Sequence, residues 1–317
     1  MLTPDQLRSF RSDGFIVLPR FIDLRMCELL QLAAETWVDA GLALREKGEP
    51  LFHHAFIAGP DKIIHVEQLH RYDRIEALEI AGMPSVRALI EQMCGRDAAW
   101  IYEGLHIHTP LAPVRTPWMQ DAIFESTDER DADTIGGINL VLYLDPVPEG
   151  EHGYYFLPGS HEARQDICAI RDERGWDTSG LSYPEVGQGD LLIYHPMLAH
   201  SFKADREREG ESTSGWMVRT LEFWYRNTDV AAKDFPTDWL EERRRLTGLA
   251  AWVNTKLQAS NEGESTEGHT VESMDVQRAR LYQTVKDDLI GSYSTKVVYP
   301  SANFCLDFKP GDRISVD

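Results

Sequence analysis

Apolar side chains in the first third of the chain recur every three or four residues, which is the period of an amphipathic helix. Two segments show this pattern, one following Asp23 and one over residues 84–95. A shorter helix is predicted from Thr3, because the Pro at the next position and Gln6 complete a capping box. Residues 14–18 form a short apolar run that predicts a buried strand.

From about residue 100 the pattern changes to short runs rich in β-branched and aromatic residues, separated by Gly and Pro turns. Strands that follow helices in this way predict an α+β protein with a β barrel or sandwich. Helical periodicity then returns in two segments joined by a polar loop, predicted over residues 259–270. The strand runs cover 100–102, 138–144, 190–194 and 216–225, and the later helices 239–257 and 276–290.

The length of 317 residues fits one domain with additions better than two complete domains. We therefore expect a single domain over 1–317. Its parts would be an N-terminal helical flank over 1–99, a β core over 100–228 and a C-terminal helical extension over 229–317.

Acidic residues outnumber basic ones by 52 to 32, which gives a formal charge of −20. This charge repels nucleic acid and anionic membranes, so neither is an expected partner. It favours a cationic substrate, although most acidic surfaces are simply solvated. The chain shows no leader pattern and no apolar run of membrane-spanning length, which predicts a cytoplasmic protein. The four cysteines lack C-x-x-C spacing, so we expect inert thiols rather than disulfides or zinc ligands.

The segment Pro117-Trp118-Met119-Gln120-Asp121 is the most informative motif, and His200 follows Asp121 by 79 residues. A non-haem Fe(II) centre uses two His and one carboxylate on one face and leaves adjacent positions open. A His-x-Asp sequence with a distant His supplies these ligands. Here a methionine, Met119, stands where the first His is expected.

Together with three further motifs, this segment resembles the phytanoyl-CoA dioxygenase family. The others are the turn Leu157-Pro158-Gly159-Ser160-His161, the Gly189-Asp190 strand that leads to His200, and Arg219 at the start of the last strand run. The resemblance covers roughly residues 2–226. It implies a double-stranded β-helix core, Fe(II) as cofactor, 2-oxoglutarate as co-substrate, and hydroxylation or related C–H oxidation of a small organic substrate.

The resemblance also assigns individual residues. It makes Asp121 and His200 the iron ligands, with Met119 at the third position, and implies no catalytic group beyond this metal site. Arg219 would pair with the distal carboxylate of 2-oxoglutarate, which suits a guanidinium. An inserted loop leaves Arg206 and Arg208 as alternatives for that role. Thr109 takes the place of a family lysine at the co-substrate, and Trp118, Gln120 and Phe124 are expected to line the substrate site.

Met119 leaves two functions open. A neutral thioether is a weak ligand for Fe(II), so the chain is either an oxygenase with an altered iron site or a non-catalytic ligand-binding or regulatory protein on the same fold. His106 and His108 alternate on a strand and share a face, so either is a possible replacement imidazole, but a structural role is favoured. Structural roles are also favoured for His161 and His195. The sequence does not define the oligomeric state or the identity of the substrate.

Overall fold

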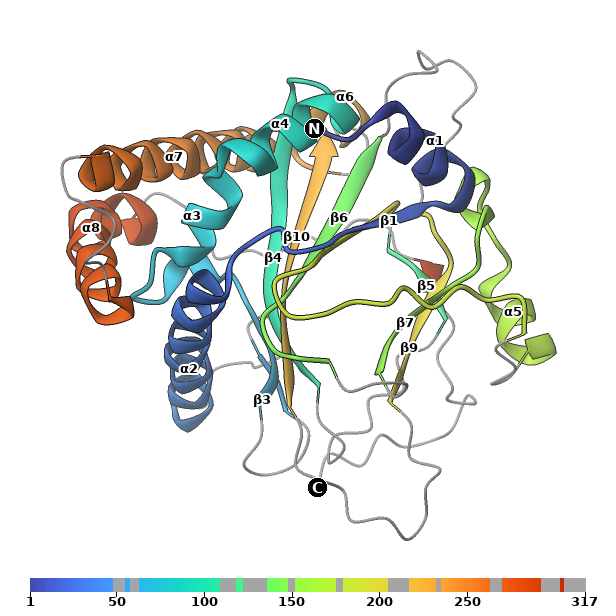
Figure 1. The fold of residues 1–317 in the computed structure, drawn as a ribbon, viewed down its shortest axis with the longest axis horizontal. Coiled ribbons are helices and arrows are strands. Elements are labelled where there is room, and N and C mark those ends of the chain that lie inside the picture. Colours follow the sequence, from blue (N-terminus) through green and yellow to red (C-terminus); the bar gives the residue numbers. More distant parts are fainter. Residues whose placement is uncertain are drawn as a thin grey trace, which may run out of the picture.

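The computed structural model describes residues 1–47, 55–57, 63–108, 118–121, 136–147, 152–174, 179–204, 217–231, 235–262, 270–291 and 303–304. In this part of the chain, two antiparallel sheets face each other and most helices lie on the outer side of the larger sheet (Figure 1). The fold is α+β with a double-stranded β-helix core, which confirms the prediction from the sequence.

The N-terminal elements follow the predicted pattern closely. Helix α1 (Pro4–Asp13) begins with the capping box at Thr3 and ends at Gly14, whose φ of 86° suits a residue without a side chain. Strand β1 (Phe15–Leu18) then pairs antiparallel with β8 (Leu191–Tyr194). Helix α2 (Leu24–Glu46) extends beyond the periodic segment that predicted it.

The larger sheet has seven strands in the order β1-β8-β6-β10-β4-β3-β2. Strand β10 lies near its middle and pairs with both β6 and β4, so β10 fixes the register of the sheet. The pattern of the sequence does not predict β2 or β3. The strands not yet bounded are β2 (Ala55–Ile57), β3 (Ile63–Glu67), β4 (Ala98–His108), β6 (Gly137–Tyr143) and β10 (Val218–Asn227).

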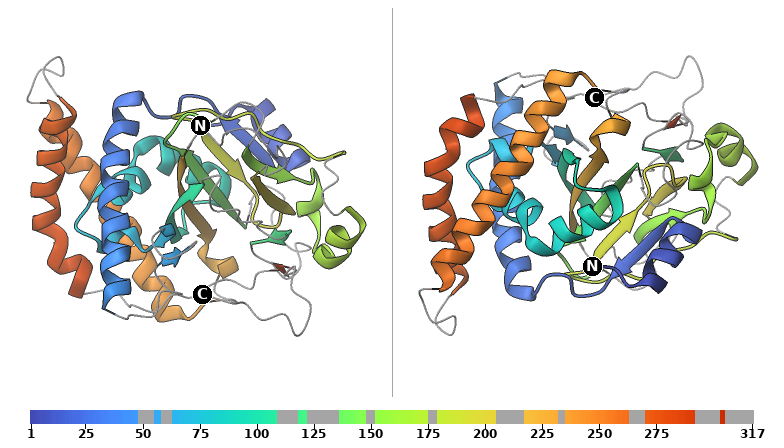
Figure 2. Two further views of the ribbon diagram at one scale, coloured as in Figure 1. Left: turned by 90° about the horizontal axis from the view of Figure 1, so that it is seen from below. Right: turned by 90° about the horizontal axis from the view of Figure 1, so that it is seen from above.

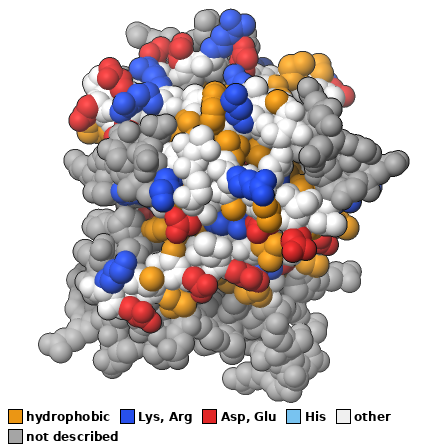
Figure 3. Space-filling model, turned by 90° about the vertical axis from the view of Figure 1, so that its left-hand side faces the viewer, with side chains coloured by type: hydrophobic (Ala, Val, Ile, Leu, Met, Phe, Trp, Pro, Cys, Tyr) orange, Lys and Arg blue, Asp and Glu red, His pale blue; other side chains and the backbone are white. Residues whose placement is uncertain are grey.

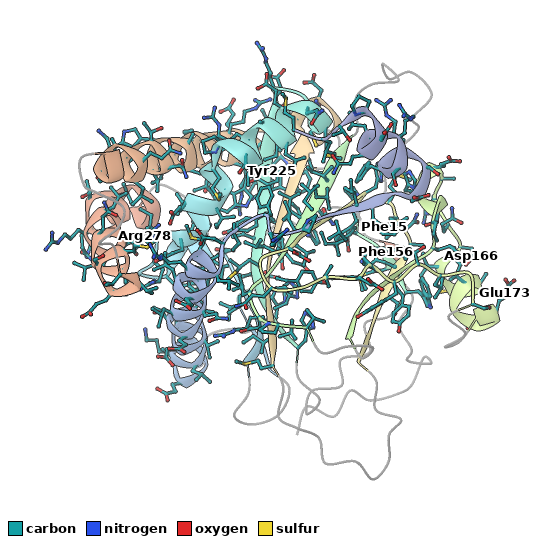
Figure 4. The ribbon with its side chains drawn as sticks, in the orientation of Figure 1. Phe15, Phe156, Asp166, Glu173, Tyr225 and Arg278 are labelled. Carbon is teal, nitrogen blue, oxygen red and sulfur yellow. The ribbon has the colours of Figure 1, made fainter. Side chains whose placement is uncertain are left out.

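A layer of helices covers the outer face of this sheet. The apolar side chains of Leu221, Phe223 and Tyr225 on β10 enter one large cluster with residues of these helices. Arg278 of α8 donates to both carboxylate oxygens of Glu79 on α3, which ties two helices together within the layer (Figure 4). The layer consists of α2, η2 (Leu69–Arg71), α3 (Glu76–Gly82), α4 (Pro84–Cys94), α6 (Thr228–Ala231), α7 (Thr237–Glu262) and α8 (Val271–Gly291).

Two further views show the same layering, with α7 and α8 on one side, the strands between and α5 on the other (Figure 2). Acidic and basic side chains are interspersed over the outer surface of the helical layer (Figure 3). No helix in the part of the chain that the structure describes is long and apolar enough to cross a membrane.

The smaller sheet has the order β11-β5-β9-β7 and is followed outward by α5. Between the sheets, Phe15 of β1 stacks on Phe156 of β7 with ring centroids 4.9 Å apart (Figure 4). The bounds are β5 (Met119–Gln120), β7 (His152–Phe156), β9 (His200–Ala204), β11 (Asn303–Phe304), η3 (Ser160–Glu162) and α5 (Ile167–Arg174).

The cysteines agree with the prediction only in part. Cys27 and Cys94 are buried free thiols, and burial raises their pKa to about 11 and about 12, which keeps both thiols protonated and inert. Cys168, however, is disulfide-bonded, so the expectation of four inert thiols is wrong. Sequence spacing gave no sign of this bond, because it joins positions that only the fold brings together.

Candidate metal centre

The structure brings Asp121 and His200 together on adjacent strands of the smaller sheet. Strand β5 pairs antiparallel with β9, and the partner of Met119 in the register is His200. Asp121 follows the end of β5, so it lies two residues beyond Met119. Both side chains are buried, and the Oδ1 atom of Asp121 lies 3.5 Å from the Nε2 atom of His200.

His200 is held with one ring nitrogen directed at Asp121. Its Nδ1 lies 2.7 Å from the carbonyl oxygen of Leu198. Because a carbonyl only accepts, Nδ1 donates its proton to Leu198, so Nε2 is the nitrogen that faces Asp121 and the one a metal ion would bind. The Ser160 hydroxyl accepts the backbone N–H of Ala199 at 2.8 Å, so the Pro-Gly-Ser-His turn fixes the residue just before His200.

Asp121 is held by donors on its other oxygen. Its Oδ2 accepts from the Asn139 side-chain amide at 2.6 Å and from the Tyr194 hydroxyl at 2.8 Å. Arg226 in turn donates to the amide oxygen of Asn139 at 2.9 Å. Burial, and then Asp121, raises the pKa of Tyr194 well above its usual value, so Tyr194 remains a donor. These contacts leave Oδ1 directed toward His200.

These two residues fit one metal ion. Carboxylate and imidazole ligands lie about 2.0–2.2 Å from a divalent ion, so two atoms that share it lie at most about 4.4 Å apart. The observed 3.5 Å is within that limit. Among the described residues, no third His, Cys, Asp or Glu completes a group that would hold a metal. Met119 lies directly opposite His200 in the register of β5 and β9, so its side chain is on the same face as His200 and beside the pair.

Arg219 does not lie where the sequence predicted. It is on the outer face of β10 with Leu221, and its guanidinium donates to both oxygens of Asp145 at 2.8 Å and to the carbonyl of Gln31. The residues of β10 on the inner face are the alternate ones, including Thr220 and Glu222. The prediction that Arg219 reaches into the site is therefore wrong, and Arg206 and Arg208 lie outside the described residues.

Two of the expected substrate-lining residues also point elsewhere. The Gln120 side chain is fully buried and bonds to the backbone of Ala163, Met197 and Gln165. Trp118 packs in an apolar cluster with Ile167 of α5. Successive residues of an extended segment point to opposite faces. Met119 and Asp121 share one face, so Trp118 and Gln120 lie on the other. Thr109 and Phe124, the other two predicted residues, lie outside the described residues.

The inner face also carries a polar network that the sequence pattern does not predict. The Tyr154 hydroxyl donates to Oε1 of Glu222, and Oε2 of Glu222 lies 3.5 Å from Nε2 of His106. The network continues from His106 to the Tyr102 hydroxyl at 3.3 Å, which lies 2.6 Å from Nε2 of His65. A signal was present, because Glu222 is a carboxylate placed between Leu221 and Phe223 in a strand run.

Two facing antiparallel sheets with this inner pair of ligand-type side chains match the class of double-stranded β-helix oxygenases that the motifs indicated. The family model described as phytanoyl-CoA dioxygenase (PhyH) matches residues 10–206. The chain belongs to this family. No curated protein is similar enough in sequence to count as a relative.

Solved structures with the same fold share little sequence with the chain. HygX from Streptomyces hygroscopicus with nickel, 2-oxoglutarate and hygromycin B bound is 15% identical, with a TM-score of 0.52 over 72% of this chain and 88% of that one. EctD from S. alaskensis with bound Fe is 13% identical, with a TM-score of 0.55 over 72% and 78%. EctD with 2-oxoglutarate and 5-hydroxyectoine is 14% identical, with a TM-score of 0.54 over 72% and 77%.

Proposed function

We propose that the protein is an Fe(II)/2-oxoglutarate-dependent oxygenase that hydroxylates, or otherwise oxidises a C–H bond of, a small organic substrate. Asp121 and His200 hold the iron in this proposal, and Met119 occupies the third ligand position. Bound there, Fe(II) supplies the open positions for a 2-oxo acid and dioxygen and the oxidising power for the reaction.

The observation that carries the proposal is the orientation of the two ligand atoms. His200 presents Nε2 to Oδ1 of Asp121, and the other polar atom of each side chain, Nδ1 and Oδ2, is hydrogen-bonded to a neighbour. The contacts to Leu198 and Asn139 fix the two ligand atoms toward each other, as the hydrogen-bond partners behind metal ligands do.

Family membership supports 2-oxoglutarate as co-substrate, and HygX and EctD have both been crystallised with it. Arg219 does not reach the inner face, because its guanidinium is bound to Asp145. Arg226 alternates with Glu222 on the inner face of β10, and its guanidinium donates to Asn139. We assign no residue to the distal carboxylate of 2-oxoglutarate. The small molecules bound to HygX and EctD support a small organic substrate.

A second candidate is a non-catalytic ligand-binding or regulatory protein on the same fold. One observation favours it: within the described residues, the pair at Asp121 and His200 has Met119 beside it and no third residue of a usual ligand type. Mutation of residues that only hydrogen-bond to metal ligands lowers metal affinity by about 10–100-fold. Loss of an imidazole that binds the metal directly should weaken Fe(II) binding at least as much.

Replacing Met119 by histidine separates these candidates. Met119→His completes a 2-His-1-carboxylate face, so it should tighten Fe(II) binding and raise succinate formation from 2-oxoglutarate above the level of the unchanged protein. Both proteins are loaded anaerobically with Fe(II), the affinity is measured by titration, and succinate is measured after oxygen is admitted. Met217→His is the control, because Met217 is exposed just before β10 and away from the site.

Each outcome has a distinct meaning. Equal or faster turnover by the methionine form would make Met119 a competent ligand or a bystander. If neither form binds iron, the non-catalytic candidate replaces the oxygenase. If Met217→His has the same effect as Met119→His, added imidazole alone explains the gain.

A further inference from the structure

The inner face of the larger sheet is divided into an apolar and a polar half. The apolar half, toward β1 and β8, holds a cluster that includes Val141, Leu192 and Val218. The polar half lies over β3, β4 and β10, where His65, Glu67, His106 and Glu222 share one face by register. Such a division is typical of ligand sites, in which a few placed polar groups orient a molecule against apolar walls.

The polar groups of this half meet closely beside Gly104. A Cβ atom on Gly104, between Tyr102 and His106, would lie 2.5 Å from the Tyr102 hydroxyl and 2.9 Å from Nε2 of His65. Only a glycine allows these two groups to meet there. The network is also reached from one end, since the side chain of His106 is 23% exposed and that of Glu222 only 3%.

The charge of this region is negative within the described residues. Glu67 and Glu222 are each 2% exposed, and the charges of Asp121 and Glu222 both act on the Tyr194 hydroxyl. Burial, and then His106 and His108, lowers the pKa of His65 well below its usual value, so His65 is neutral. The guanidinium of Arg226 is 0% exposed and bonds to Asn139 and to backbone carbonyls, which places it in the wall of the site.

A second and independent feature points to a ligand. Tyr143 is 2% exposed on the inner face of β6, and its hydroxyl has no hydrogen-bond partner among the described residues. Glu222 is among the groups whose charge acts on this hydroxyl. A buried hydroxyl without a partner is unfavourable, and such groups commonly mark a position where a missing molecule bonds.

We propose that a cationic nitrogen of the substrate binds where the polar and apolar halves meet, with Glu222 as its charged partner and the Tyr143 hydroxyl as a second acceptor. The inference rests on the proposed function only in naming the ligand a substrate. A carboxylate next to Glu222 would be repelled, and an alcohol would gain no ion pair, whereas an ammonium group donates to both acceptors and balances the buried charge.

Three probes of similar shape and different charge test the proposal: cyclohexylamine, cyclohexanol and cyclohexanecarboxylate. Their binding to the full chain is measured calorimetrically without oxygen. Cyclohexylamine should bind most tightly, and Glu222→Gln should weaken it by about tenfold or more, as expected for loss of a charge-assisted bond. Glu241→Gln, which changes an exposed carboxylate on α7, should leave the affinity unchanged.

Tyr143→Phe provides a second variant if Glu222→Gln does not fold. It should weaken cyclohexylamine severalfold and leave the melting temperature unchanged or higher, because it removes only a hydroxyl without a described partner. The proposal is overturned if cyclohexylamine does not bind, if the carboxylate or the alcohol binds at least as tightly, or if both variants keep the wild-type affinity.

These results are separable from the proposed function. If amine binding depends on Glu222 but the protein forms no succinate with Fe(II) and 2-oxoglutarate, the amine site is supported and the oxygenase proposal is contradicted. If the protein forms succinate but Glu222→Gln does not change amine binding, the oxygenase proposal is supported and the amine site is contradicted.

Discussion

At the scale of single residues, hydrogen-bond partners separate the carboxylates that hold the fold from those that remain available. Asp145 receives the Arg219 guanidinium and backbone N–H, and Glu79 receives both donors of Arg278. Asp121 and Glu222 differ, because each keeps one oxygen directed at the Nε2 atom of an imidazole. The first pair of carboxylates is committed to structure, and the second pair carries the chemistry that we propose.

This distinction predicts a structural role for Arg219. Arg219→Ala removes the guanidinium that donates to Asp145. The Asp145 carboxylate still accepts from the Gln31 side chain and from the backbone N–H of residue 219. We expect a loss of about 2–3 kcal/mol in the free energy of unfolding, somewhat below the ~3–5 kcal/mol typical of breaking a fully buried pair. Urea unfolding measures it. Arg96→Ala, which breaks an exposed pair with Glu91, should change little.

The same variant tests the role that the sequence assigned to Arg219. Because the side chain faces the helical layer, the affinity for 2-oxoglutarate should remain close to that of the wild type. A large loss of 2-oxoglutarate binding without a loss of stability would contradict the orientation of Arg219 in the structure.

At the scale of elements, periodicity predicted those that have strong local signals. The capping box of α1 and the apolar runs of β6, β8 and β10 were all readable from residues close together in the chain. The short strands β2, β3 and β7 were not, because their pairing depends on partners far away in the sequence.

The candidate site was predictable only in part for a related reason. The spacing of Asp121 and His200 identified the pair that the structure brings together. Both faces of β10 are buried, so its sequence shows no contrast between an apolar and a polar face. Alternation puts Arg219 and Glu222 on opposite faces, but it does not indicate which face lies between the two sheets. Trp118 and Gln120 alternate with Met119 and Asp121, so they lie on the opposite face of the segment from the ligand positions.

His161 links two elements and predicts a pH dependence of stability. Its Nε2 donates to the carbonyl of Arg11 on α1, and burial lowers the pKa of His161 below its usual value despite this bond. The unfolded chain therefore takes up this proton at about pH 6.5, before the folded protein does. The contribution to stability is complete above that pH and is lost as the pH falls toward the folded pKa, by at most about 1.4 kcal/mol per pH unit.

His161→Gln keeps a donor for the Arg11 carbonyl and removes the titration. Urea unfolding between about pH 7.5 and about pH 5.5 should therefore show a smaller loss of stability in the variant than in the wild type. Other groups titrate equally in both proteins, so the difference isolates His161. Parallel pH profiles would show that His161 does not titrate differently in the folded and unfolded states.

At the scale of the whole molecule, the two faces of the larger sheet have different tasks. The outer face is packed against helices by a large apolar cluster and by buried ion pairs such as Glu79–Arg278. The inner face combines an apolar half with the polar network and the metal pair. A rigid outer layer allows the inner face to carry buried polar groups at some expense of stability.

The central claim is that Asp121 and His200 form the metal centre of an oxygenase of this family. Anomalous diffraction at the iron edge, from crystals loaded anaerobically with Fe(II), tests it most directly. We predict a peak about 2.0–2.2 Å from both Oδ1 of Asp121 and Nε2 of His200. A peak elsewhere in the molecule, or none between these two atoms at saturating Fe(II), would contradict the account.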